Sequence, residues 1–481
     1  MPLALCAGAA RATEPAPAAA AEDAADALRE RLTEREDRRR PLEPYEVPLA
    51  GRPLTLGGEL EVEASGVRRR ILDAAGVEGD RARLESGLDL EAFYGFEAPL
   101  ALFAQIHLGF EQELLDATPD GSSGFLAERG EIWAVLEEPA ELPLVFDVGR
   151  LDFEDDRRWW WNEELDALRL SIEPGPFELS LALARELLPR RLDRRRIDPE
   201  QEGVLRFLAE ATLDHSGGHS LGLFGLFQDD HSARPAPGDL VRTPREDDSD
   251  ARLGWFGARA LGVFELASRG LLGYWLDAAL VRGREELVGF EDPVGGVSRV
   301  ESRLQRDVAG FGVDAGLNWM LPLAFEPRIF LGYAFGSGDR TPDAGSDRSF
   351  RQSALQSNEA GFGGVERFPS YGLLLDPELS NLGVATAGIG FSLLRSSSLD
   401  LVYHAYHLPE PATELRDAGI EAELTGVQRR LGDAVDLVLA LEEWERFELT
   451  LAAGVFRAGR AFGAHSGRWS AGGVLALRYA F

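Results

Sequence analysis

Three carboxylates lie close together in the sequence, Glu163, Glu164 and Asp166. A pair of carboxylates about 5–10 Å apart can hydrolyse a glycosidic bond, so this group is the first candidate for chemistry. The alternative, which we favour, is a polar rim or a cation-binding edge, and no motif of a nucleophilic serine appears either. Histidine offers no metal site, since His404 and His407 stand three residues apart and so lie on opposite faces of a strand. The sequence therefore predicts no enzyme, no metal and no cofactor.

Most other charged side chains stand at alternate positions of short segments that are otherwise apolar. Side chains point alternately to the two faces of a strand. If the leucine-rich faces meet lipid, the charges face water, because an Arg or Lys near the bilayer midplane costs roughly 2–4 kcal/mol. This argument places on the inner wall, in the substrate path, Glu61, Arg83, Asp89, His107, Arg169, Asp314, Asp436 and Arg478. For each of them the alternative is a solvated or ion-paired residue with no role in selectivity.

The segments that carry these residues have the length of membrane strands. From Leu54 onward there are about eighteen of them, each about 9–14 residues long, as a tilted strand that crosses a membrane requires. In one of them Phe177, Leu179, Leu181 and Leu183 alternate with smaller or charged residues. The pattern predicts an all-β protein.

The connections between the segments alternate in length. Short ones, such as 174–176 and 395–398, separate long ones, which include 186–202, 228–251, 283–307, 337–381 and 409–432. Short periplasmic turns on one rim and long extracellular loops on the other are typical of a transmembrane antiparallel β-barrel in the outer membrane. A Greek-key sandwich gives no reason for this alternation. We expect the longest loop, 337–381, to fold over or into the barrel mouth as a constriction.

Three adjacent tryptophans, Trp159 to Trp161, follow an acidic and basic run within the stretch from Phe146 to Leu170. In a membrane barrel such rings are typical of the headgroup belt, where one side is apolar and the other wet. The alternative is a soluble sandwich with the tryptophans under a loop. The strand and loop pattern favours the barrel.

Several motifs resemble one known family. The region GRLDFEDDRRWWWNEELDALRL, residues 149–170, looks like the signature region of the alginate-export family of outer-membrane channels. Further similarity lies in FLGYAFGSGD (330–339), LQSNEAGFGG (355–364), ERFPSYGLLLDPELSNL (366–382) and LVYHAYH (401–407). The resemblance implies an outer-membrane channel whose lumen is lined with cations for a polyanion. Arg150, Arg157 and Arg367 fall on or beside these motifs, so we add them to the substrate path.

Departures from the family pattern alter the expected substrate. Glu131 follows Gly130 where an arginine would suit a polyanion, and Asp152 and Glu359 stand where basic or polar residues are expected. Glu131 is therefore a further residue of the path. More acidic than basic residues face the predicted lumen, so we expect mild cation selectivity. These departures favour a neutral or mixed-charge saccharide over alginate itself.

Composition and the N-terminal sequence limit the possible partners and domains of the protein. The chain has 481 residues and a net charge of −32, and an acidic protein is unsuited to nucleic acid. Residues 1–12 resemble the end of a secretory signal peptide with an Ala-x-Ala site, or else are a disordered alanine-rich terminus. Residues 13–50 then form a periplasmic N-terminal segment and residues 51–481 the barrel.

The sequence thus predicts a channel in the outer membrane. We expect it to export a polysaccharide or oligosaccharide passively, with outer-membrane lipid and a periplasmic scaffold protein as its other partners. One alternative is a substrate-specific uptake porin. Another, from a different class, is a barrel-anchored surface enzyme or binding protein.

Overall fold

The fold is known from a computed structural model that describes residues 45–69, 80–96, 99–115, 123–139, 142–215, 218–230, 232, 235–291, 293–341, 345–420 and 422–481. Residues 1–12 and 13–44, predicted to hold a signal peptide and the start of a periplasmic segment, lie outside the described residues. Residues Tyr45–Leu49 form a short strand, β1, which pairs with the beginning of β2. The described residues contain no helix that is long and apolar enough to cross a membrane.

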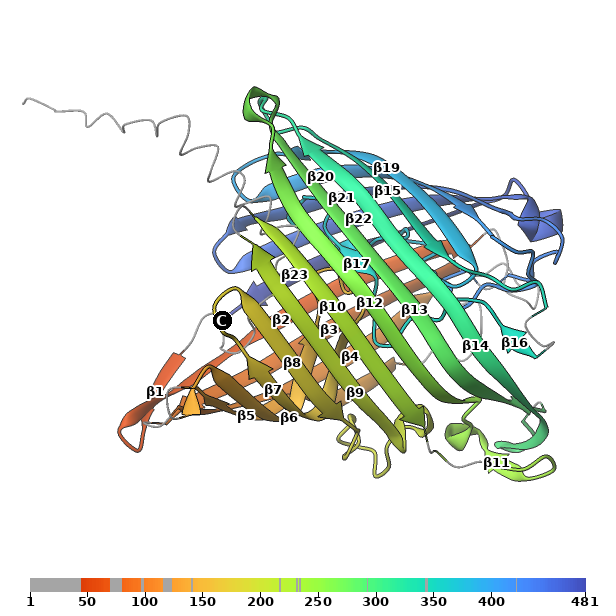
Figure 1. The fold of residues 1–481 in the computed structure, drawn as a ribbon, viewed down its shortest axis with the longest axis horizontal. Coiled ribbons are helices and arrows are strands. Elements are labelled where there is room, and N and C mark those ends of the chain that lie inside the picture. Colours follow the sequence, from red (N-terminus) through yellow and green to blue (C-terminus); the bar gives the residue numbers. More distant parts are fainter. Residues whose placement is uncertain are drawn as a thin grey trace, which may run out of the picture.

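Eighteen antiparallel strands close into a barrel, which confirms the predicted fold class (Figure 1). Each pairs with the next, and β2 pairs with β23 from Glu59↔Ala480 to Arg69↔Ser470, which closes the ring. The strands are β2 (Arg52–Arg69), β3 (Asp80–Gly95), β4 (Leu100–Leu115), β5 (Ser123–Glu137), β6 (Leu144–Glu154), β7 (Asn162–Ile172), β8 (Phe177–Ala184), β9 (Val204–His215), β10 (His219–Asp230), β12 (Ser249–Glu265), β13 (Leu271–Phe290), β14 (Val297–Met320), β15 (Arg328–Gly336), β19 (Leu382–Ser392), β20 (Ser397–His407), β21 (Arg430–Trp444), β22 (Phe447–Ala458) and β23 (Trp469–Ala480).

Shorter elements lie in the long connections. They are β11 (Leu240–Arg242), which pairs with β14, β16 (Ser346–Asp347), and β17 (Glu359–Ala360), which pairs with β18 (Phe368–Pro369). Short 3₁₀ turns are η2 (Pro199–Gln201), η3 (Thr243–Arg245), η4 (Ala267–Arg269) and η5 (Arg460–His465).

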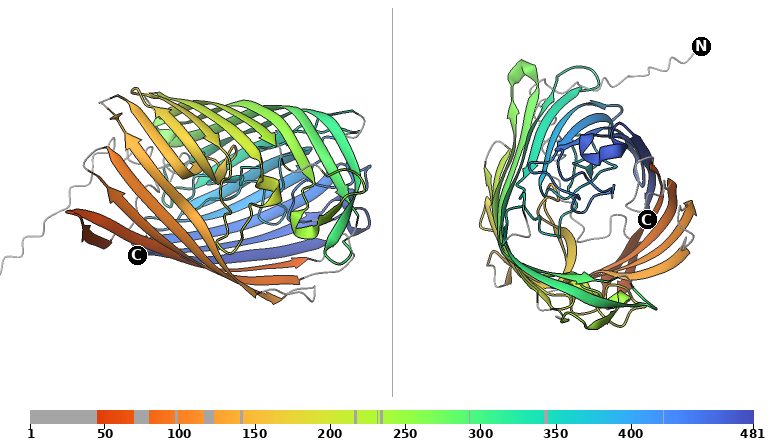
Figure 2. Two further views of the ribbon diagram at one scale, coloured as in Figure 1. Left: turned by 90° about the horizontal axis from the view of Figure 1, so that it is seen from below. Right: turned by 90° about the vertical axis from the view of Figure 1, so that its right-hand side faces the viewer.

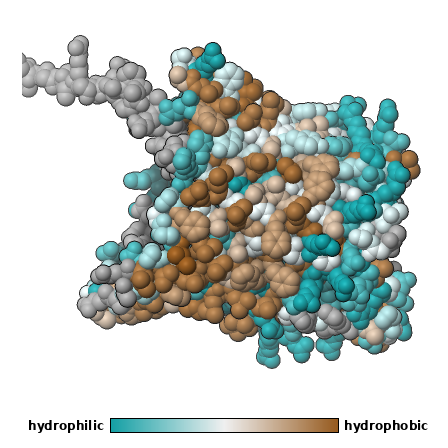
Figure 3. Space-filling model, in the orientation of Figure 1, coloured by the Kyte–Doolittle hydropathy of each residue, from teal (hydrophilic) through white to brown (hydrophobic). Residues whose placement is uncertain are grey.

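Alternation in the strands sorts side chains between lipid and lumen. On β10, Leu221 and Leu223 are exposed on the outer surface, whereas Phe224 is buried on the inner side. Repeated around the ring, this produces a hydrophobic band over the strands, bordered by hydrophilic side chains (Figure 3). The band is what a lipid bilayer requires of a barrel wall.

One predicted loop is a hairpin instead. The sequence predicted a long connection at 283–307, but β13 continues to Phe290 and β14 begins at Val297. The prediction was wrong because it ended each strand where the leucine alternation stopped. Beyond that point charged pairs on the outer face, such as Arg284 with Asp307 at 3.2 Å, take the place of lipid contacts.

The wall is interrupted between β5 and β6. The two strands pair only from Ile132↔Arg150 to Glu137↔Val145. Gly149 has φ 137°, and a Cβ there would collide with the carbonyl oxygen of Ile132. Beyond this point the ends of β6 and β7 lead into a loop that packs inside the barrel, among the loops seen down the ring in Figure 2.

A bridging segment, residues 185–192, closes the gap. Its beginning continues β8, since the backbone N–H of Arg185 donates to the carbonyl of Asp166 at 2.9 Å. Its end pairs with β5, since the N–H of Leu192 donates to the carbonyl of Ala127 at 2.8 Å. The segment therefore joins β8 to β5 across the ends of β6 and β7.

Candidate functional site: the lumen and its loops

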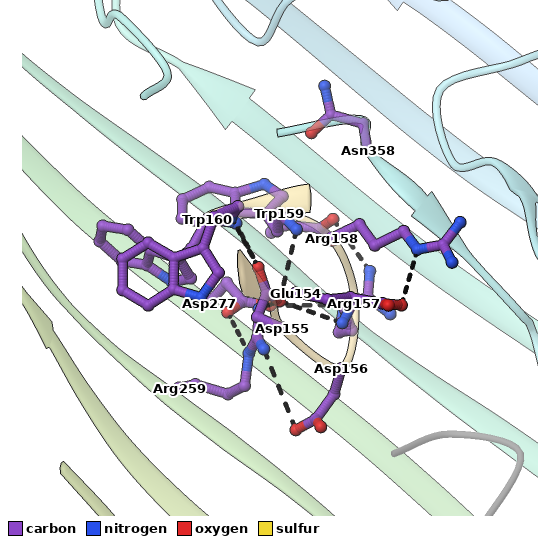
Figure 4. Close-up of polar contacts among 12 residues, drawn as sticks. Glu154, Asp155, Asp156, Arg157, Arg158, Trp159, Trp160, Arg259, Asp277 and Asn358 are labelled. Atoms are coloured by element: carbon purple, nitrogen blue, oxygen red, sulfur yellow. Dashed lines mark hydrogen bonds and ion pairs between the residues drawn. The ribbon is translucent and has the colours of Figure 1, made fainter. Parts of the chain in front are cut away.

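Asp155 organises the loop between β6 and β7 (Figure 4). Its carboxylate accepts hydrogen bonds from the backbone N–H groups of Trp160 and Trp161 at 2.7 and 2.9 Å. The guanidinium of Arg259 on β12 lies 2.5 Å away. Burial alone would raise the pKa of Asp155, but Arg259 and the backbone donors outweigh it and hold the pKa below its ordinary value. The loop is folded around a charged carboxylate.

The tryptophans lie inside the barrel, so the predicted place in the headgroup belt was wrong. All three side chains are 2–3% exposed. Trp160 stacks on Phe224 of β10 with ring centroids 5.1 Å apart. The indole N–H of Trp159 donates to the hydroxyl of Tyr371 at 2.8 Å. The prediction assumed that β6 and β7 end at the rim, whereas the interior offers these rings both apolar packing and a hydrogen-bond acceptor.

Arg157 fastens the same loop to the wall of β12–β14. Its guanidinium lies 3.3 Å from Asp277 of β13 and donates to Asp314 of β14 at 3.1 Å. It also lies over the ring of Trp275, 4.7 Å from the centroid. The charged side chains are at most 5% exposed. Removing one partner of such a pair leaves a buried lone charge, which costs about 3–5 kcal/mol.

The longest loop, residues 337–381, packs against this loop inside the barrel, where its length predicted it (Figure 2). The carbonyl of Arg158 accepts the backbone N–H of Asn358 at 2.9 Å, and its guanidinium lies 2.5 Å from Glu359. Arg367 forms an ion pair with Glu154 at the end of β6. These contacts therefore hold the two loops together inside the barrel.

The longest loop also covers charged and aromatic side chains on the inner faces of β20 and β21. Asp436 of β21 accepts the backbone N–H of Leu373 at 3.2 Å and lies 3.5 Å from Nε2 of His404. The hydroxyl of Tyr406 donates to the carbonyl of Tyr371 at 2.8 Å. These groups face loop atoms, not open water.

A further ion cluster ties two loops to the extended β13–β14 hairpin. Glu285 lies 2.9 Å from Arg306, 3.4 Å from Arg351 of the longest loop and 3.5 Å from Arg416 of the β20–β21 connection. Asp347 adds a second carboxylate 2.5 Å from Arg351. Positive and negative groups are again matched within the protein.

The wall of β2–β4 and β23 keeps its charges in contact with water. Glu61 pairs with Arg478 at 3.1 Å, and Nδ1 of His107 lies 2.5 Å from Asp89. Arg83 pairs with Glu111 at 3.0 Å. These six side chains are 29–45% exposed. We call this part of the lumen, where charged side chains remain in contact with water, the open wall.

A recess of about 310 Å³ lies along this open wall. Its charged lining consists of the carboxylates Glu61, Glu63, Glu85 and Glu111 and the basic residues His107 and Arg191. Carboxylates outnumber cations here.

The remaining predicted path residues lie in three different settings. Arg169 faces the lumen and is held by Asp147 at 2.9 Å. Glu131 is buried and accepts the indole N–H of Trp133 at 2.9 Å. Arg150 shares its strand face with Phe146 and Val148, whose side chains are exposed on the outer surface. The structure thus places Arg150 away from the lumen.

Arg150 is covered by the bridging segment. Its guanidinium lies 3.0 Å from Glu164 and 3.7 Å from Glu186 of that segment. Asp166, beside it, accepts the backbone N–H of Leu187 at 2.7 Å. Two of the three carboxylates considered for glycoside hydrolysis, Glu164 and Asp166, therefore serve this buried cluster.

Sequence reasoning missed three residues that build the interior: Asp155, Arg259 and Tyr371. One signal was available on the strand that carries Arg259. Gly257 stands there because a Cβ would collide with the ring of Trp160. A glycine on the inner face of a strand, near an arginine, can mark the place where a loop packs.

Residues 131–472 match the family model for alginate export, which is more than half of the chain. The chain belongs to the alginate-export family. It is 26% identical over 294 residues to the alginate production protein AlgE of Pseudomonas aeruginosa, 60% of this chain and 58% of that protein. It is 28% identical over 141 residues to AlgE of Azotobacter vinelandii, 28% of each chain. The matched part thus spans less than two thirds of either relative.

Solved structures share the fold. The Pseudomonas aeruginosa protein OccK7 (OpdD) superposes with a TM-score of 0.54 at 14% identity, covering 89% of this chain and 98% of that one. OpdK from the same organism, solved with vanillate, gives 0.53 at 11% identity, with 89% and 98% covered. Family and fold together establish an outer-membrane channel and its location in the outer membrane.

Proposed function

We propose that this channel exports a polysaccharide or oligosaccharide passively, and that the saccharide is neutral or of mixed charge. The observation that carries the proposal is that the arginines in the family motifs form ion pairs with carboxylates of the protein itself. Arg157 and Arg169 are paired with Asp277 and Asp147, and Arg367 with Glu154. A polyanion needs cations that face the lumen, and these are already neutralised by carboxylates.

The open wall supports the same substrate class. Its half-exposed carboxylates repel a polyuronate and accept hydrogen bonds from the hydroxyl groups of a neutral sugar. The relatives named above are alginate production proteins. For this member of the family we therefore infer the family's transport route with a different cargo.

Current block in planar bilayers tests the proposed cargo. A neutral gluco-oligosaccharide added to the reconstituted channel should interrupt the current, whereas a polyuronate of equal length should do so much less. Glu61→Gln with Asp89→Asn should weaken the difference. Glu46→Gln with Glu200→Gln, exposed at the two rims, is the control that should leave it unchanged. Stronger block by the polyuronate in the wild type would contradict the proposal.

Direction and partners need a test in cells. We propose export, with a periplasmic scaffold protein at the short-turn rim, where β1 extends the sheet. Deletion of the gene should then trap polymer in the periplasm. Loss of growth on an external saccharide, without trapped polymer, would assign uptake instead.

A further inference from the structure

Arginine is concentrated at one place on the long-loop rim, in the bridging segment and the residues that follow it. This stretch contains Arg185, Arg190, Arg191, Arg194, Arg195 and Arg196, whose acidic neighbours in the sequence are Glu186, Asp193 and Asp198, and Asp198 pairs with Arg194. The whole chain has a net charge of −32. A basic stretch in so acidic a protein calls for an anionic ligand or for internal partners.

Internal partners account for only part of it. Arg190 pairs with Glu128 at 3.0 Å, and Arg191 with Asp193 at 2.9 Å. Arg185, Arg195 and Arg196 are exposed, and within the described residues none makes an ion pair or a side-chain hydrogen bond. Three guanidinium groups therefore remain available to a ligand.

The same segment carries exposed apolar side chains. Leu187, Leu188 and Leu192 are 69, 58 and 54% exposed. Arg185 continues β8 on the side of the strand that carries Leu181 and Leu183, which belong to the lipid-facing surface. Exposed leucines on a segment that continues a lipid-facing strand are suited to contact with lipid.

A groove in the outer wall reaches Leu183, two residues before Arg185. It has a volume of about 570 Å³, within the usual ~300–1,000 Å³ of small-molecule sites. Its lining on the lipid-facing side includes Leu168, Leu183, Phe207, Phe146 and Val148. In a bilayer an apolar hollow of this kind is filled by an acyl chain.

We infer that the bridging segment and this groove form a binding site for a phosphorylated glycolipid of the outer leaflet. An acyl chain lies in the groove, and Arg185, Arg195 and Arg196 hold the phosphates by charge-assisted hydrogen bonds. The site depends on the location in the outer membrane and not on the proposed cargo. Lipid bound there would also hold the bridging segment in place over the gap between β5 and β6.

A water-soluble polyanion fits the same arginines less well. A soluble polyanion gains nothing from contact with three exposed leucines or with an apolar groove on the lipid side of the wall. Its route would lie in the lumen, whereas Arg185 stands on the outer face of β8. The observations therefore favour lipid, and the polysaccharide becomes an outcome of the test.

Native mass spectrometry of the full-length barrel in mild detergent measures the binding, with purified lipid A that carries two phosphates as the probe. The variant R185Q/R195Q/R196Q should bind it more weakly, by roughly fivefold for each arginine removed. The matched control R242Q/R348Q/R460Q changes three exposed arginines elsewhere on the long-loop rim and should bind as the wild type does. Heat-dependent gel mobility checks that each barrel is folded.

A second variant tests the groove. Ala134→Trp fills it from β5 and should reduce binding of lipid A with all arginines present. Lipid A without phosphates should bind the wild type weakly. Unchanged binding in the arginine variant would overturn the inference. So would a soluble polyuronate that binds as tightly as lipid A and loses its affinity in the same variant, since the arginines would then serve the polysaccharide.

Discussion

Two parts of the barrel wall carry the same kind of residue and use it differently. On β12–β14 and β20–β21 the inward charges are buried beneath loops, and Asp277 and Asp314 among them are paired with an arginine. On β2–β4 and β23 the inward charges, among them Glu61 and Asp89, remain half-exposed. Alternation puts charges on the inner face of a barrel, but the loops decide whether they become structural ion pairs or the lining of a channel.

The largest effect is expected from removing the covering loop. Replacing Phe350 to Phe368 by a short Gly-Ser linker should raise single-channel conductance severalfold while the barrel still folds, because loops tolerate deletion better than strands. Planar bilayer recordings measure it. Shortening the tip of the β13–β14 hairpin, residues 291–296, is the control and should change conductance little. Equal conductance after the loop deletion would mean that the loop does not narrow the channel.

Replacing an arginine should cost much more stability on the covered wall than on the open wall. Arg157→Ala leaves Asp277 and Asp314 buried without a partner, so the loops should lose about 3–5 kcal/mol of stability. Arg83→Ala on the open wall should cost no more than about 1 kcal/mol, because water screens its ion pairs. Limited trypsin digestion measures this difference through cleavage at Arg348 and Arg367. Similar cleavage rates in the two variants would remove the distinction between the walls.

Acid should detach the covering loops from the barrel wall only at low pH. The folded-state pKa of Asp155 lies below its ordinary value of 3.8. A carboxylate with a lowered pKa contributes stability at pH values above 3.8, and that contribution is lost as pH falls through the folded-state pKa. Tryptophan fluorescence and conductance should therefore stay constant from pH 7 to 4 and change below pH 4. Asp155→Asn should show the open-loop signal already at pH 7.

The strands could be predicted from the sequence because alternation is local. Phe177 to Leu183 show their faces within seven residues, and the pattern of short and long connections predicted the barrel. The position of the tryptophans could not be predicted in this way. It depends on Gly149, where β6 leaves the wall, and on contacts such as that of Arg157 with Asp314, which lie 157 residues apart in the chain.

Arg150 shows the same limit in one residue. The family motifs put Arg150 in the substrate path, whereas in the structure it shares the outer face of β6 with Phe146 and Val148. The answer lies in the bridging segment, which brings Glu186 over it from a connection that no local pattern links to β6. The length of the longest loop predicted that it covers the lumen. Which side chains a loop contacts could be learned only from the structure.

The smallest expected effect is on ion selectivity, and it separates the walls by chemistry. Excess carboxylate on the open wall should make the channel mildly cation-selective in a salt gradient. Glu61→Gln with Asp89→Asn should move the reversal potential toward zero, whereas Asp314→Asn with Asp436→Asn should move it much less, because those carboxylates are covered by loops. The effect should fade toward 1 M salt, where the Debye length falls to ~3 Å. Anion selectivity of the wild type would mean that Arg157, Arg169 and Arg367 act on the passing ion despite their partners, and export of a polyanion would then become the better proposal.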